Sequence, residues 1–91
     1  MLNERIKELR LARNLTQVEL ANNLNVTKQC VSNWENNNIQ PSVDMLIKLS
    51  KYFSVSCDYL LGIENRKYLD VSDLTDAQVS HIRQIINDIL S

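Results

Sequence analysis

Four polar side chains are predicted to share one face of a helix near the middle of the chain. With about 100° per residue, one arc of the segment 28–35 holds Lys28, Gln29, Ser32 and Asn33. The opposite arc holds residues expected to face the core, namely Cys30, Val31 and Trp34. An amide can pair with adenine, an ammonium group can donate to guanine, and a hydroxyl can serve either base. The polar face therefore suits base edges of duplex DNA, with about 1–3 kcal/mol of discrimination per bidentate pair. An ordinary solvated helix face is the alternative.

The elements that precede this face are predicted to be two helices. Leu2, Ile6 and Leu9 recur at helical spacing, which predicts a first amphipathic helix over residues 2–13 that Asn14 ends. Thr16 and Glu19 form a capping box, so a second helix is expected over about residues 16–23.

A sharp turn should separate the second helix from the third. Asn25 lies where the chain must turn, and Asn accepts the left-handed conformation more readily than other non-glycine residues. Thr27 is a good N-cap for a third helix that runs to Glu35. The Asn run at 36–38, followed by Pro41, should stop that helix.

Three further segments complete the predicted all-α fold. Ser42 should cap a fourth helix over residues 43–53, and Ser56 a short fifth one that ends at Gly62. Residues 63–74 are predicted to be a linker, and Thr75 with Gln78 forms a capping box for a last helix over 75–91. That helix carries an apolar stripe of Val79, Ile82, Ile85, Ile86, Ile89 and Leu90. The stripe should be buried, either on the five-helix domain or against a second chain.

A longer motif surrounds the polar face. The stretch 16–21, a short turn, the stretch 26–36 and then Pro41-Ser42 resemble the Cro/repressor (XRE) family of helix-turn-helix proteins. The resemblance covers residues 1–62 and includes the ending Asp58-Tyr59-Leu60-Leu61-Gly62. It implies a lambda-repressor-like DNA-binding domain in which the third helix enters the major groove.

The resemblance also implies roles for individual residues. Base contacts would come from the polar face of helix three, that is Lys28, Gln29, Ser32 and Asn33. Phosphate contacts would come from Arg10, Gln17, Asn36, Gln40 and the backbone amide near Val43. The sequence departs from the family at Asn25 and Asn37, where glycine is usual, and the loop after Asn36 lacks Lys and Arg up to Lys48. DNA affinity per monomer is therefore in doubt, and dimerisation is the usual remedy.

Composition restricts the alternatives. The net charge is −1, but residues 1–53 hold seven Lys/Arg against five Asp/Glu, whereas residues 54–91 hold three against six. Cys30, Cys57 and the single His81 do not suggest a disulfide framework, a metal site or a catalytic centre, so we expect reduced thiols, no cofactor and no enzyme. Because no apolar run approaches the roughly 20 residues that span a bilayer, a cytoplasmic protein without membrane contact is expected.

Two function classes follow. The first is a DNA-binding transcriptional regulator, favoured as a repressor, which reads an inverted-repeat operator as a homodimer with half-sites about 34–36 Å apart or a multiple of that. The second is an adaptor or antitoxin that keeps this fold and binds a protein partner. An adaptor would tolerate acidic residues on the outward face of helix three, and none occurs at the polar positions there.

Overall fold

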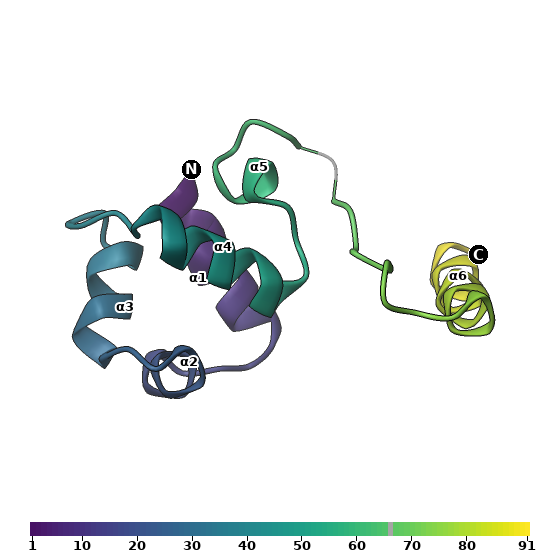
Figure 1. The fold of residues 1–91 in the computed structure, drawn as a ribbon, viewed down its shortest axis with the longest axis horizontal. Helices are drawn as coiled ribbons and strands as arrows, with labels where there is room; N and C mark the ends of the chain where they lie inside the picture. The colour runs from purple at the N-terminus through teal and green to yellow at the C-terminus, as the bar shows by residue number, and fades with distance from the viewer. Residues whose placement is uncertain (66) are drawn as a thin grey trace.

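The computed structural model describes residues 1–65 and 67–91, and all regular elements within that part are helices. In chain order they are α1 (Leu2–Ala12), α2 (Gln17–Leu24), α3 (Lys28–Glu35), α4 (Val43–Phe53), α5 (Cys57–Leu60) and α6 (Asp76–Leu90). The predicted all-α fold is confirmed, and α1 to α5 pack together while α6 stands apart (Figure 1). Arg66, within the predicted linker, lies outside the described residues.

The helix starts are set by hydroxyl side chains. Every helix from α2 to α6 has a Ser or Thr N-cap whose oxygen accepts a hydrogen bond from the backbone N–H three residues later. The two predicted capping boxes, Thr16 with Glu19 and Thr75 with Gln78, are both present. These bonds satisfy N–H groups that have no partner within the helix.

Left-handed residues redirect the chain between helices. Asn14, Asn25 and Asn37 have φ angles of 56°, 58° and 59°, respectively. Asn25 follows α2 directly, as the sequence predicts, and lets α3 begin three residues later. Ser54 adopts the same conformation after α4, with φ of 55°.

The core lies inside the α1–α5 bundle. Its buried side chains are Ile6, Leu20, Ala21, Leu24, Val31, Trp34, Leu49, Phe53 and Leu60. Val31 and Trp34 are 0% and 3% exposed, and Cys30 packs against the core from a half-buried position. The predicted inward arc of α3 is therefore confirmed, and the orientation of its polar arc follows from it.

The segment that leaves the bundle is anchored by α1. The guanidinium of Arg5 donates to the backbone oxygen of Tyr59 at 2.8 Å and to the side chain of Asn65 at 3.4 Å. It also lies over the Tyr59 ring, 3.9 Å from the centroid. The chain beyond α5 is thus held at its start, before it runs out to α6 (Figure 1).

Candidate nucleic-acid interface

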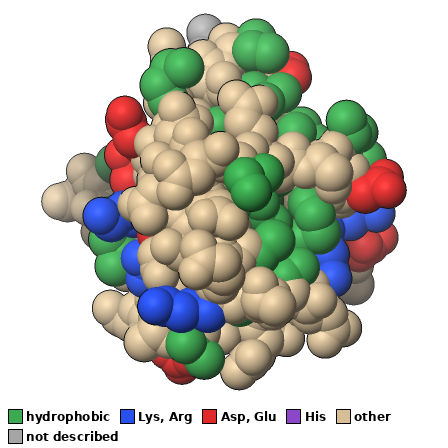
Figure 2. Space-filling view, turned by 90° about the vertical axis from the view of Figure 1, so that its left-hand side faces the viewer, with side chains coloured by type: hydrophobic (Ala, Val, Ile, Leu, Met, Phe, Trp, Pro, Cys, Tyr) green, Lys and Arg blue, Asp and Glu red, His purple; other side chains and the backbone are tan. Residues whose placement is uncertain are grey.

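The outward face of α3 forms a continuous polar surface. Its members, Lys28, Gln29, Ser32 and Asn33, are called the reading surface below. Lys28 and Gln29 are exposed, whereas Ser32 and Asn33 are half-buried. Figure 2, which looks onto the left-hand side of Figure 1 where α3 lies, shows mostly uncharged polar side chains and backbone with a few scattered Lys and Arg.

Hydrogen bonds one turn apart order this surface. Gln29 Nε2 donates to Asn33 Oδ1 at 3.0 Å, and Asn36 Nδ2 donates to Ser32 Oγ at 3.2 Å. Both bonds join residues i and i+4, which are neighbours on a helix surface. Gln29 is thus held against Asn33, and Ser32 against Asn36, which lowers the entropy that these side chains would lose on binding.

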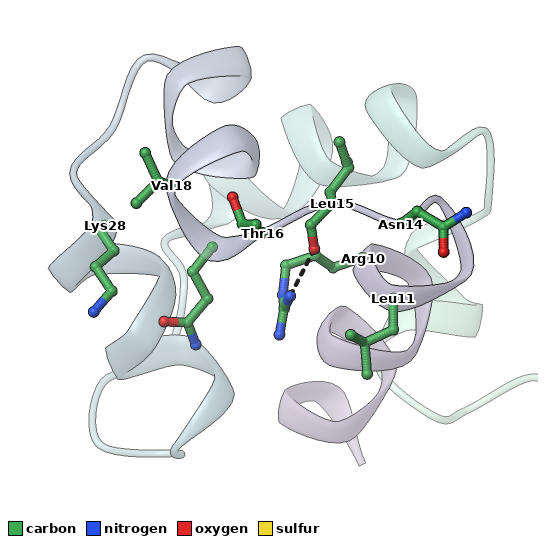
Figure 3. A pocket seen from close by; sticks show the side chains of 8 residues that line it. Arg10, Leu11, Asn14, Leu15, Thr16, Val18 and Lys28 are labelled. Carbon is green, nitrogen blue, oxygen red and sulfur yellow. Dashed lines mark hydrogen bonds between the residues drawn. The ribbon is translucent and has the colours of Figure 1, made fainter.

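Arg10 is largely buried in an ion pair between α1 and α3. Its residue is 8% exposed, and its guanidinium forms a two-point ion pair with Glu35, with distances of 2.7 Å from Nε to Oε2 and 3.0 Å from Nη2 to Oε1. A third bond runs from Nη1 to the backbone oxygen of Leu15 at 2.7 Å (Figure 3). The hydrogen bonds that Arg10 donates to the Glu35 carboxylate raise the pKa of Arg10 above its ordinary value. Three of the five guanidinium N–H donors are thus used inside the protein, and the phosphate contact expected of Arg10 stays a prediction.

Gln17 depends on the same carboxylate. Its Nε2 donates to Glu35 Oε1 at 3.2 Å, which leaves a second N–H and Oε1 on a half-buried side chain at the start of α2. Gln17 also lines a surface hollow of about 480 Å³ that extends to Lys28 on α3 and to Thr16 and Arg10 (Figure 3). A DNA phosphate at this hollow would meet Gln17 and Lys28 together, and the role expected of Gln17 stays a prediction.

The other expected phosphate contacts lie around the end of α3 and the start of α4. Asn36, Gln40 and Val43 are all exposed. Val43 is the first residue of α4, where backbone N–H groups lack helical partners and favour an anion. Asp44 in the same turn stabilises the helix dipole but opposes a phosphate there.

The other cations near this surface differ in how they are engaged within the protein. Lys48 donates to the backbone oxygen of Leu24, between α4 and α2. Arg13 lies 5.1 Å from the ring centroids of both Tyr52 and Phe53. Lys28 is exposed on α3 itself, so it is the cation best placed to meet the DNA backbone.

The apolar stripe of α6 is uncovered. No residue of α6 is buried; Ile85 and Ile86 are 46% and 44% exposed, and Ile89 and Leu90 are 76% and 79% exposed. Val79 and Ile82 are half-buried, and with Ile86 they line a hollow of about 480 Å³ that the preceding linker closes with Tyr68, Leu69 and Val71. The alternative in which α6 docks on its own bundle is not the arrangement seen in Figure 1.

Two features of the interface were not predicted. Glu35 was not identified as the brace between α1, α2 and α3, although Arg10 lies four residues after Ile6 and so falls on the buried face of α1. The sequence predicts only a linker around Tyr68 and Leu69, and it does not indicate that these two side chains line a hollow together with α6. Their signal is weak because an extended segment with one covered face lacks helical periodicity.

The fold and this surface define a helix-turn-helix domain of the kind that binds DNA. The helix-turn-helix family model matches residues 6–60. The chain belongs to this family, in its XRE or Cro/repressor type.

Named relatives and a solved structure agree with that assignment. The chain is 36% identical over 87 residues to the "HTH-type transcriptional regulator ImmR" of Bacillus subtilis, covering 96% of this chain and 68% of that protein. It is 42% identical over 62 residues to the "HTH-type transcriptional activator BcrR" of Enterococcus faecalis, covering 68% of this chain and 30% of that protein. A solved complex of SinR with SinI contains a chain with a TM-score of 0.66 and 27% identity, covering 100% of this chain and 84% of that one.

Neither a metal cluster nor a membrane-spanning helix is found among the described residues. Among residues 1–65 and 67–91, no group of three His, Cys, Asp or Glu side chains is placed to hold a metal ion, and Cys30 and Cys57 are free thiols. Within the same residues, no helix has the length and apolar character needed to cross a membrane.

Proposed function

We propose that this protein is a transcriptional regulator that reads an inverted-repeat operator through the major groove as a homodimer, and that it acts as a repressor in the cytoplasm. The observation that carries the proposal is the ordered reading surface on α3, whose polar groups point outward while Val31 and Trp34 anchor the helix in the core. The names of the ImmR and BcrR relatives support a role in transcription.

Within this proposal, residues 1–62 form the DNA-binding domain, 63–74 a linker and 75–91 the dimerisation helix. Four isoleucines, together with Val79 and Leu90, give α6 an apolar stripe, and the described part of one chain leaves Ile85, Ile86, Ile89 and Leu90 of this stripe exposed. Burying each such side chain stabilises an assembly by about 1.5–3 kcal/mol. Pairing two α6 helices would join two reading surfaces, so that the second half-site is bound from a high effective concentration.

Selection of bound sequences from a random duplex pool tests this function. The wild-type chain should enrich a two-fold symmetric site. Ile86→Asp should keep each half-site but lose the symmetric arrangement, because a charge is placed in the middle of the stripe. Ser80→Asp, on the exposed polar side of α6, is the matched control and should select the wild-type site.

A second candidate function is binding of a protein partner. The observation that favours it is the same exposed stripe on α6, together with the similarity to a protein solved in a complex named SinR/SinI. If the random pool gives no enriched sequence, this candidate is favoured, and partner capture that Ile86→Asp abolishes and Ser80→Asp preserves would then support it.

A further inference from the structure

The hydrogen bond between Gln29 and Asn33 determines which groups each amide can still offer. A primary amide carries two N–H donors on nitrogen and one carbonyl acceptor. Because Gln29 Nε2 donates to Asn33 Oδ1 at 3.0 Å, Gln29 retains one N–H donor and its Oε1 acceptor. Asn33 retains two N–H donors, and one of the two lone pairs on its oxygen is used.

The remaining pair on Gln29 matches one base. In the major groove adenine presents the N7 acceptor beside the N6 amino donor, whereas guanine presents two acceptors, N7 and O6. One donor and one acceptor on Gln29 fit adenine. The reverse orientation, with Asn33 donating to Gln29 Oε1, would leave two donors on Gln29 and would fit guanine instead.

Donors outnumber free acceptor lone pairs on the rest of the reading surface. Asn33 offers two N–H groups, Lys28 offers an ammonium group, and Ser32 keeps its O–H because its oxygen accepts from Asn36. Such donors pair with N7 and O6 of guanine or O4 of thymine, whereas cytosine presents an amino donor. Gln29 is therefore the member of the reading surface whose amide oxygen accepts no hydrogen bond from its neighbours on the helix, beside a free N–H donor.

We propose that Asn33 is a positioning residue that orients the amide of Gln29 to read adenine, and that this adenine is flanked by bases with acceptor edges. This specificity rests on the proposed function, since it requires α3 to lie in the major groove. Asn33 would then influence two base positions of the operator: the base that Asn33 contacts and the adenine that Gln29 contacts.

Selection from a random duplex pool with the full chain tests this coupling. When the selected sequences are aligned, each column is one base position of the operator. The Gln29 column is the position at which Gln29→Ala loses the base preference of the wild type. Wild type should show adenine there, and Asn33→Ala should lower the preference for adenine over guanine by about tenfold. Asn33→Asp retains an oxygen that can accept from Gln29 and should keep the adenine. Ser32→Ala, on the same surface, should leave that column unchanged. Thermal unfolding of each variant confirms that it folds.

The outcomes separate the two proposals. Guanine in the Gln29 column of the wild type, or an Asn33→Ala profile altered only in the Asn33 column, would overturn the coupling while leaving sequence-specific binding intact. A wild-type chain that enriches no sequence would overturn the coupling and DNA reading together.

Discussion

Glu35 Oε1 lies 3.0 Å from Arg10 Nη2 and 3.2 Å from Gln17 Nε2, so one carboxylate at the end of α3 binds both α1 and α2. The Glu35 side chain is 2% exposed, and the Arg10 side chain is 9% exposed. Among the described residues, no buried side-chain N or O atom lacks a hydrogen-bond partner. Through Glu35, the ion pair with Arg10 and the hydrogen bond from Gln17 thus fix α3 relative to α1 and α2.

Breaking this ion pair from one side should destabilise the fold strongly. Arg10→Met leaves the Glu35 carboxylate buried without its cation, and the free energy of unfolding should fall by about 3–5 kcal/mol. Urea unfolding followed by circular dichroism measures the loss. Because an apolar pair can replace a buried ion pair at little cost, the double variant Arg10→Met/Glu35→Leu should recover most of it. Additive losses in the double variant would contradict this explanation.

Lys28 should control the salt dependence of DNA binding. Lys28→Gln removes one cation from the reading surface, so the slope of log affinity against log salt should decrease in magnitude by about one. Fluorescence anisotropy with one duplex at several salt concentrations gives the slope. Lys51→Gln removes an exposed cation at the far end of α4 and should leave the slope unchanged; equal effects of the two variants would place the DNA elsewhere.

Asn25 should tolerate glycine better than alanine. Its φ of 58° is open to glycine, whereas a left-handed alanine costs about 1–2 kcal/mol. Asn25→Ala should therefore lower the melting temperature, and Asn25→Gly should change it little. Asn22→Ala, within α2, is the matched control and should not destabilise, because alanine favours a helix. A melting temperature unaffected by Asn25→Ala would show that the turn does not need this conformation.

The capping box of α2 should make stability depend on pH. Hydrogen bonds from Thr16 lower the pKa of Glu19 below its ordinary value of 4.5. The folded pKa is the lower one, so the stabilisation is complete above the ordinary value and is lost as the pH falls through the folded one. Glu19→Gln keeps the box, as Gln78 does in α6, without a titrating group. The free energy of unfolding of wild type and Glu19→Gln should be measured from about pH 6 to about pH 3. On acidification the wild type should lose stability relative to Glu19→Gln. A difference between the two that does not change with pH would contradict this role of Glu19.

The helices were predictable because their signals are local. Thr27 and Glu35 bound α3 as expected, and Asn25 adopts the left-handed turn that its position requires. The ion pair of Arg10 was not predictable in this way because its partner Glu35 is 25 residues away, and local periodicity does not reveal a contact at that separation. A charged residue on the buried face of α1 was the available signal, since a buried charge needs a partner.

The central claim is that α3 reads bases, and a comparison of two duplexes tests it most directly. Binding of wild type and Gln29→Ala should be measured by fluorescence anisotropy on the selected operator and on a scrambled duplex of equal length. Gln29→Ala should weaken operator binding by about 1–3 kcal/mol and leave scrambled binding nearly unchanged, while Asn22→Ala changes neither. Equal losses on both duplexes, or none on either, would contradict base reading by α3.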